Sequence, residues 1–268
     1  MTSFSDFKRL PVEAYCNRLR ASGGLWIFHH IPKTAGSSLT RELRIILPPY
    51  RNICAEEVPG QAEDRNAQLM QAVEVFLRDS SSTSFRSASG HLRWPHILRI
   101  QEGFPNAKLF TFLRDPVDRV VSDYRYAKTP KHPSHEVFQK RFPSLEHYIE
   151  SPEAQNKMWK FLTGKKDAVS TSVRSVFDSY TFVGLLESIE SDFLFFSSIN
   201  GCPRRMGARA NVTKPQTDNV VEMDRSLRER IESLNPRDME LYSTVKQVLD
   251  AKRQEMQAQV EARRALWS

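Results

Sequence analysis

The arrangement of apolar residues constrains the fold most strongly, because short apolar runs alternate with longer stretches of helical spacing. Short runs of this kind are typical of buried strands, and their separation by helices favours parallel strands joined by crossover connections. Helices on such crossovers cover both faces of the sheet. We therefore expect an α/β fold, a three-layer sandwich with a central, mostly parallel sheet. The expected strands are 25–31, 87–90, 108–113 and 180–185. The expected helices are 38–47 and 61–78 between the first two strands and 187–199 after the last.

Both ends of the chain have helical patterns. Residues 4–21 have the spacing of one amphipathic helix, which Gly23 and Gly24 end. Near the other end, Asn235 is of the N-cap type and Pro236 suits a first helical position, so a long charged helix is expected from there almost to Trp267. No change of composition marks a domain boundary. The chain is predicted to be a single domain, 1–268, with an N-terminal helix (1–24), an α/β core (25–222) and C-terminal helices (223–268).

The charge balance favours an anionic ligand. The formal net charge of the 268 residues is +7, which does not distinguish a nucleotide from a polysaccharide, a nucleic acid or a membrane surface. No apolar run approaches the roughly 18 residues that span a bilayer, and the first residues lack the apolar centre of a secretion signal. A cytoplasmic protein is therefore expected. The three cysteines, Cys16, Cys54 and Cys202, are far apart and are predicted to be buried thiols, not a disulfide framework or a zinc site.

The stretch IFHHIPKTAGSSL, residues 27–39, has the order strand, small-residue turn, helix. Backbone N–H groups converge at such a turn and the helix adds partial positive charge, so the turn suits a phosphate. The nucleotide-kinase loop G-x-x-x-x-G-K-[ST] is absent, because the lysine precedes the loop glycine. A plain strand-to-helix turn with an exposed lysine is the alternative. The expected phosphate-binding residues are Lys33, Thr34, Ala35, Gly36, Ser37 and Ser38.

The stretch LFTFLRDPVDRVVSDY, residues 109–124, repeats this order. Arg114 ends the apolar strand, a proline starts the next helix, and Ser122 lies about two turns into that helix. Arg114 as a charge-assisted fork and Ser122 as a donor could hold a second phosphate. Asp115 and Arg119 are expected to form structural ion pairs at the helix start instead of binding a ligand directly.

Together the two stretches resemble the sulfotransferase family, whose members use the activated sulfate donor 3′-phosphoadenosine 5′-phosphosulfate. In that family a PKTAG-[ST]-[ST]-like loop, here 32–38, holds the 5′-phosphosulfate, and an R-D-P-x-x-R-x-x-S-x-Y stretch, here 114–124, holds the 3′-phosphate. The closest resemblance covers most of 25–250 and is to the branch with carbohydrate sulfotransferases such as heparan sulfate 2-O-sulfotransferase. It implies a P-loop-like sulfotransferase fold, sulfuryl transfer to a hydroxyl group, and a saccharide or glycoconjugate as acceptor.

Two later stretches resemble the same branch. SASGHLRW places His91 after a small-residue strand end, where the branch has its catalytic base in a similar Gly-His. FVGLLESIESDF, followed by RANVTK, is similar to the family's late strand, helix and cofactor-covering loop. The resemblance implies that Arg209, Asn211, Thr213 and Lys214 close over the donor.

The chemistry of these residues suits an in-line displacement on sulfur. Lys33 can stabilise the negative charge that grows on the bridging oxygen, and His91 can take the proton of the acceptor hydroxyl, because an unperturbed imidazole has a pKa near 6.5. His96 and then His30 are the next candidates for this base. No metal is expected, because the donor has no triphosphate to neutralise, and no nucleic acid partner is expected.

Two alternatives remain at this point. A phosphotransferase with an atypical phosphate loop would need Mg²⁺ and carboxylates that hold it, and no suitable acidic pair adjoins either strand end. A non-catalytic nucleotide-binding protein is the other alternative. The presence of Lys33 and His91 together with both phosphate-binding stretches argues against it.

Overall fold

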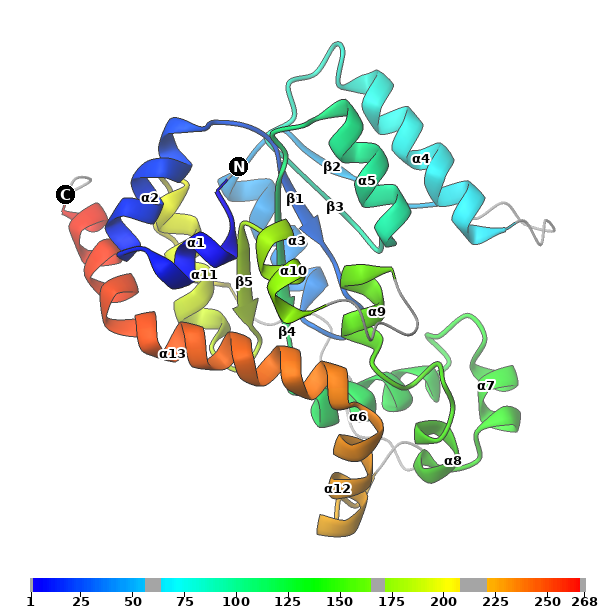
Figure 1. Ribbon diagram of the computed structural model, residues 1–268. Helices are drawn as coiled ribbons and strands as arrows, with labels where there is room; N and C mark the ends of the chain where they lie inside the picture. The colour runs from blue at the N-terminus through cyan, green and yellow to red at the C-terminus, as the bar shows by residue number, and fades with distance from the viewer. Residues whose placement is uncertain (1, 56–63, 165–171, 208–220, 266–268) are drawn as a thin grey trace.

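A parallel sheet forms the centre of the fold, and all its strands lie within the residues that the computed structural model describes, 2–55, 64–164, 172–207 and 221–265. The strands lie side by side in the order second, third, first, fourth, fifth, and every neighbouring pair is parallel. Their carboxyl ends therefore meet at one edge of the sheet (Figure 1). The strands are β1 (Trp26–His29), β2 (Tyr50–Asn52), β3 (Ser87–Gly90), β4 (Lys108–Leu113) and β5 (Phe182–Leu185).

Helices cover both faces of the sheet, which confirms the predicted three-layer α/β fold (Figure 1). In the view of Figure 1, α3 (Gly36–Ile46) and α11 (Ile189–Ile199) lie behind the sheet, and α5 (Trp94–Gly103) and α10 (Val173–Ser179) lie in front of it. In the described ranges, no helix is both long and apolar enough to cross a membrane. The other helices are α1 (Phe4–Arg9), α2 (Val12–Ala21), α4 (Arg65–Asp79), α6 (Pro116–Ala127), α7 (His135–Arg141), α8 (Leu145–Ile149), α9 (Lys157–Thr163), α12 (Arg225–Leu234) and α13 (Pro236–Arg264).

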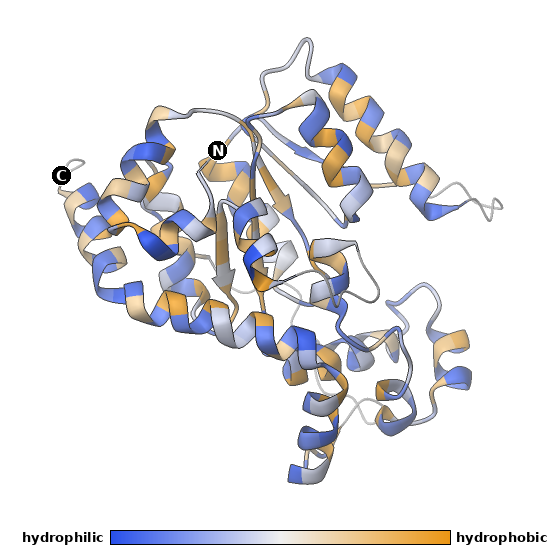
Figure 2. Cartoon of the chain, viewed as in Figure 1, coloured by the Kyte–Doolittle hydropathy of each residue, from blue (hydrophilic) through white to orange (hydrophobic). Residues whose placement is uncertain are grey.

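The apolar residues form two separate clusters. The larger surrounds the sheet, where every residue of β1 and of β4 is buried, and Figure 2 shows hydrophobic residues in orange along the central strands. The smaller joins α6, α8 and α12 through residues such as Val120, Tyr148 and Ile231, and these helices project from the lower right of the molecule in Figure 1. Helix α6 therefore runs from the sheet edge into the second cluster, so that its residues can connect the edge with the projecting helices.

The N-terminal segment corrects one sequence prediction. Residues 4–21 form two helices, α1 and α2, where a single helix was expected. Pro11 lacks a backbone N–H and disfavours a helical conformation at Leu10, whose backbone is extended, so the helix ends there and a new one begins.

The start of α13 confirms the predicted N-cap position of Asn235 and first helical position of Pro236, but Asn235 makes no side-chain capping hydrogen bond. The Oδ1 atom of Asn156 accepts hydrogen bonds of 2.9 and 3.2 Å from backbone N–H groups in the first turn of α13 instead. In return, the carboxylate of Asp238, in that same turn, accepts hydrogen bonds of 2.8 and 3.1 Å from backbone N–H groups at the start of α9. The two helix starts therefore cap each other, and the amide of Asn235 joins them by accepting a 2.8 Å hydrogen bond from the Asn156 backbone.

Candidate active site

The loop between β1 and α3 has a backbone shape that suits an anion. Lys33 and Ala35 have φ angles of 71° and 68°, in the left-handed region that residues other than glycine seldom adopt. Backbone N–H groups next to such residues form a concave nest for negative charge. Ala35 is also the N-cap of α3 and makes no side-chain capping bond, so the N–H groups of Gly36 and Ser37 stay available, whereas that of Ser38 donates to the Ala35 carbonyl at 3.1 Å. The loop thus offers convergent N–H donors at the positive end of a helix.

Thr34 and Gly36 of this loop have structural roles that were not predicted from the sequence. Thr34 is fully buried, and its Oγ1 donates a 2.9 Å hydrogen bond to the carbonyl of Ile31. Its hydroxyl hydrogen is therefore used inside the loop, and its backbone N–H is the group left for a ligand. At Gly36, a Cβ atom would lie 1.5 Å from Nε2 of His30. The glycine is thus needed to admit the His30 ring, whatever binds in the loop.

Lys33 lies beside residues of the second predicted phosphate-binding stretch. Its Nζ is 4.1 Å from the ring centroid of Tyr126, on α6, and its carbonyl accepts a 3.4 Å hydrogen bond from Arg114 at the end of β4. Burial lowers the pKa of the Lys33 ammonium, the negative charge of Asp123 opposes this, and Arg114 adds to the lowering. The fold therefore brings Lys33 and Arg114 together, as expected for residues that follow neighbouring parallel strands.

Asp115 and Arg119, at the start of α6, are structural residues, and Ser122, further along the helix, is a candidate for ligand binding. Asp115 caps the helix, because its carboxylate accepts a 3.0 Å hydrogen bond from a backbone N–H in the first turn. Arg119 is fully buried and donates hydrogen bonds to the carbonyl of Ala154 at 2.9 Å and to Asp123 at 3.3 Å. Arg119 therefore forms a structural ion pair, as the sequence predicted, whereas Asp115 has a structural role as a helix cap. Ser122, on the same helix, is partly exposed.

His91 follows β3 directly and lies against His30, which follows β1. Its Nδ1 is 3.0 Å from the carbonyl oxygen of His30, and since a carbonyl can only accept, Nδ1 carries the hydrogen. In the neutral ring, Nε2 then has a free lone pair. Burial lowers the pKa of His91, the His30 carbonyl opposes this, and the charge of Arg65 lowers it further. The arrangement favours a neutral imidazole that can accept a proton at Nε2.

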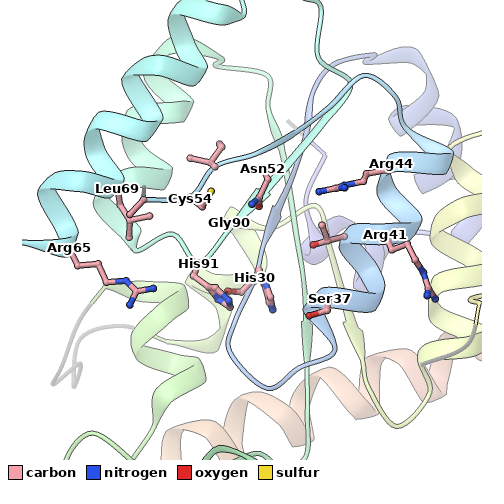
Figure 3. Close-up of a pocket in the computed structure, with 13 residues that line it drawn as sticks. His30, Ser37, Arg41, Arg44, Asn52, Cys54, Arg65, Leu69, Gly90 and His91 are labelled. Atoms are coloured by element: carbon pink, nitrogen blue, oxygen red, sulfur yellow. The ribbon is translucent and has the colours of Figure 1, made fainter. Parts of the chain in front are cut away.

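A cavity of about 440 Å³ adjoins both the His91 ring and the first turn of α3 (Figure 3). In Figure 3, Arg44 and Arg65 extend toward this cavity from opposite sides, and the two histidine rings lie side by side at its floor. The described residues of the lining include three arginines and no aspartate or glutamate, so the charged side chains that line the cavity are all positive. The lining residues are His30, Ser37, Thr40, Arg41, Arg44, Asn52, Ile53, Cys54, Ala55, Arg65, Leu69, Gly90 and His91.

Two further histidines, His29 at the end of β1 and His96 in α5, have structural roles. His29 is fully buried, with Nδ1 2.5 Å from the Tyr180 hydroxyl and Nε2 2.9 Å from the Leu92 carbonyl. His96 is also buried, accepts a 2.9 Å hydrogen bond from the Arg93 backbone at Nδ1, and has Nε2 3.1 Å from a carbonyl oxygen. Both rings use both nitrogen atoms inside the protein, so neither is placed to act on a ligand in the cavity.

The cysteines are free, as predicted, but only one of them is buried. Cys16 lies in the main core, Cys202 is partly exposed, and Cys54 is exposed in the cavity wall. The prediction of a buried thiol was wrong for Cys54, which follows the short edge strand β2 and lines the cavity, and for Cys202. In the described part of the chain, no group of three or more histidine, cysteine, aspartate or glutamate side chains could hold a metal ion.

The predicted donor-covering residues Arg209, Asn211, Thr213 and Lys214 lie outside the described residues.

Sequence reasoning also missed residues that the structure places at the site, namely Arg65 in the cavity and Tyr126 against Lys33. A signal for Tyr126 was present, because Arg119, Asp123 and Tyr126 have the i, i+4, i+7 spacing of one helix face. Arg65 had no such signal, since its position depends on how the chain returns from β2.

Comparison with known proteins identifies the class of enzyme. The profile of the sulfotransferase family matches residues 26–243. The chain therefore belongs to the sulfotransferase family, and it is an enzyme of sulfuryl transfer.

Two solved structures are similar to this chain. The sulfotransferase from Alicyclobacillus acidocaldarius has 18% sequence identity and a TM-score of 0.47, and the match covers 83% of this chain and 96% of that one. Mouse sulfotransferase SULT7A1, complexed with PAP, has 14% identity and a TM-score of 0.44, and the match covers 91% of this chain and 95% of the mouse chain. The comparison with curated proteins found no match.

Proposed function

We propose that this sulfotransferase moves a sulfuryl group from 3′-phosphoadenosine 5′-phosphosulfate to a hydroxyl group of an anionic saccharide by in-line displacement. One observation carries the proposal. A single cavity adjoins the first turn of α3, at Ser37, and the ring of His91, whose Nε2 has a free lone pair. A hydroxyl group in that cavity would have a base on one side and the anion-binding loop on the other.

The donor's charged groups match the donors of the two strand ends. The backbone N–H groups of residues 34–37 and the start of α3 suit the 5′-phosphosulfate, and Lys33 suits the bridging oxygen, where negative charge grows as the S–O bond breaks. Arg114 and Ser122 suit the 3′-phosphate. By resemblance to the family, Arg209, Asn211, Thr213 and Lys214 close over the donor.

His91 is the proposed general base. It takes the proton from the acceptor hydroxyl at Nε2 while the oxygen attacks sulfur, and the phosphate oxygen leaves on the opposite side with its electron pair. The hydrogen bond from Nδ1 to the His30 carbonyl keeps the ring in the required tautomer. That carbonyl also stabilises the imidazolium that forms, as a carboxylate does in other histidine bases. A base in this position typically accelerates a reaction about 10²–10⁴-fold.

The walls of the cavity support an anionic saccharide as acceptor. Arg44 and Arg65 can pair with carboxylate or sulfate groups, and Asn52 and Thr40 can exchange hydrogen bonds with sugar hydroxyls. A phenol or a lipid chain would instead need an apolar, aromatic-lined pocket. The resemblance of the sequence to carbohydrate sulfotransferases favours the same class of acceptor.

Two experiments test the proposal. In the first, the native enzyme and the His91→Ala variant receive ³⁵S-labelled donor with a carboxylated polysaccharide, a neutral polysaccharide, a phenol or a sterol. We expect label only on the carboxylated polysaccharide, at a rate about 10²–10⁴-fold lower with the variant than with the native enzyme. Label on the phenol or sterol would contradict the acceptor class. In the second, calorimetric titration should detect adenosine 3′,5′-bisphosphate and not ATP with Mg²⁺, and the opposite result would identify a phosphotransferase.

A further inference from the structure

The side chain of Lys33 is held at its tip by an aromatic ring. A lysine side chain is long and flexible, and its ammonium must be fixed before it can act on one atom of a ligand. Here Nζ lies over the face of Tyr126, 4.1 Å from the ring centroid. An ammonium within about 6 Å of a ring centroid is attracted by the negative face of the ring. The backbone of Lys33 comes from the β1–α3 loop and the ring comes from the end of α6, so the contact joins both strand ends of the site.

Tyr126 is itself held on two sides. The ring of His132 meets it edge-on, with centroids 5.5 Å apart and planes at 82°, and its hydroxyl lies 3.5 Å from the carbonyl of Lys131, to which it donates. The Thr129 hydroxyl donates a 2.7 Å hydrogen bond to the carbonyl of Tyr126 and fixes the turn that follows α6. The ring is therefore a fixed platform and not a mobile surface side chain.

The nearest relevant carboxylate does not compete with the ring for the Lys33 ammonium. Asp123 lies one turn before Tyr126, and its carboxylate is already bound by Lys157, by Arg119 at 3.3 Å and by the hydroxyl of Tyr148 at 2.8 Å. Its charge attracts Lys33 through space. Within the described residues, Lys33 forms no ion pair, so N–H groups of its ammonium remain for an oxygen atom on the side away from the ring.

We propose that Tyr126 is a positioning residue that holds the ammonium of Lys33 at the point where the bridging oxygen of the donor arrives. The ring face fixes the ammonium without neutralising it and without using an N–H group that the oxygen needs. The inference rests on the proposed role of Lys33 in sulfuryl transfer. It adds a residue whose effect on the reaction passes through Lys33 alone.

The test compares Tyr126→Leu with Tyr126→Phe, which keeps the ring and removes only the hydroxyl. Phe138→Leu is the matched control, because it removes a ring that packs near His132 in the same helix cluster without touching Lys33. We expect kcat of Tyr126→Leu to fall about tenfold, equivalent to about 1.4 kcal/mol, while its affinity for adenosine 3′,5′-bisphosphate changes less than about twofold. The Phe variant and the control should have nearly native kcat.

A double-mutant cycle makes the assignment specific. In a Lys33→Ala background, Tyr126→Leu should lower kcat no further, because the ring then has no cation to hold. Native or increased kcat in Tyr126→Leu, an equal loss in Tyr126→Phe, or independent losses in the double variant would each overturn the proposal. If Tyr126→Leu does not fold, Tyr126→Met replaces it with the same expectations. Failure of the proposed function would be distinguishable, because the native enzyme would then transfer no label or Lys33→Ala would keep full kcat.

Discussion

His91 and His30 are in direct contact, with ring centroids 3.9 Å apart and with Nδ1 of His91 3.0 Å from the carbonyl oxygen of His30. The His30 ring in turn occupies the space that a side chain at Gly36 would need. The proposed base and the first helical residue of the anion-binding loop are thus linked through one histidine. A substitution at His91 or at Gly36 is therefore expected to affect the other residue through His30.

His91→Ala should bind adenosine 3′,5′-bisphosphate normally and lower kcat about 10²–10⁴-fold. In the native enzyme, kcat/KM for the acceptor should rise as His91 loses its proton. Because the pKa of His91 is lowered by burial, the midpoint of that rise should lie below the usual 6.5 of imidazole. A pH–rate profile of both proteins with one acceptor checks this. A native profile in the variant would make His91 a rim residue, and His30 would be the next candidate.

Arg65 provides a control for the pH dependence of His91. Its positive charge lowers the pKa of His91, so Arg65→Gln should move the midpoint of the free enzyme to higher pH. Titration of the His91 ring by NMR measures this without any acceptor. An unchanged midpoint would mean that Arg65 does not act on His91.

Lys33→Ala should lower kcat by about 10²–10³, the range found when a donor to a developing oxyanion is removed. Its affinity for adenosine 3′,5′-bisphosphate should change much less, because the backbone donors of the loop remain. Rapid-quench kinetics and calorimetry separate the two effects. Lys246→Ala, in an exposed ion pair on α13, should have native values for both. A variant that loses only affinity would identify Lys33 as a binding residue.

Arg114→Ala should abolish the preference for a 3′-phosphate. In the native enzyme, saturating adenosine 3′,5′-bisphosphate should raise the melting temperature by roughly 5 °C, well above the effect of AMP. The variant should respond equally to both nucleotides, whereas Arg174→Ala, on the exposed side of α10, should respond like the native protein. Equal shifts in the native protein would exclude Arg114 and Ser122 as a 3′-phosphate site.

Gly36→Ala should destabilise the fold by about 1–3 kcal/mol, because the new methyl group would overlap with the His30 ring. In a background with His30→Ala, the same substitution should cost far less, since the space is then open. Urea unfolding of the four proteins measures the difference. If Gly36→Ala costs the same in both backgrounds, the contact with His30 is not the reason for the glycine.

The buried carboxylate of Asp123 should make the protein sensitive to acid. Burial alone would raise its pKa, but Lys157 and Arg119 outweigh burial and lower the pKa from 3.8 to about 2. Its contribution of about 2 kcal/mol is present above pH 3.8 and is lost as the pH falls toward 2. Asp123→Asn should therefore be less stable at pH 7 and approach the native protein in acid, while Glu229→Gln, in an exposed pair, should change little at either pH.

Four strands could be predicted from the sequence, two of them to the residue, whereas β1 (Trp26–His29) and β5 (Phe182–Leu185) are shorter than the expected 25–31 and 180–185. β3 and β4 have the predicted boundaries, because small or apolar residues there end at Gly90 and Leu113. β2 was not predicted, because Tyr50–Asn52 is a short edge strand with polar residues and no alternating pattern. The small helices between α6 and β5 were not predicted either, since they are stabilised by contacts with distant helices, α7 and α8 with α6, and α9 and α10 with α13, and not by local periodicity.

The contacts of the candidate site could likewise be predicted only where a local sequence signal exists. Lys33 and Arg114 could be expected to meet, because each follows a strand and the two strands are neighbours. The tautomer of His91 depends on a carbonyl oxygen at the end of another strand, and the platform under Lys33 depends on the turn after α6. Contacts of this kind connect residues far apart in the sequence, and no local pattern encodes them.

The reciprocal capping of α9 and α13 has a consequence for how the molecule opens. If α13 detached, the amides that begin α9 would lose the carboxylate of Asp238, and if α9 unwound, α13 would lose the amide of Asn156. Neither helix can fray at its start without the other, so the two should behave as one cooperative unit in native-state hydrogen exchange. The backbone amide of Trp159, whose side chain is fully buried, would then exchange its hydrogen only when α13 also opens. The hydrogen bond that links the two helices joins residues 79 positions apart in the sequence.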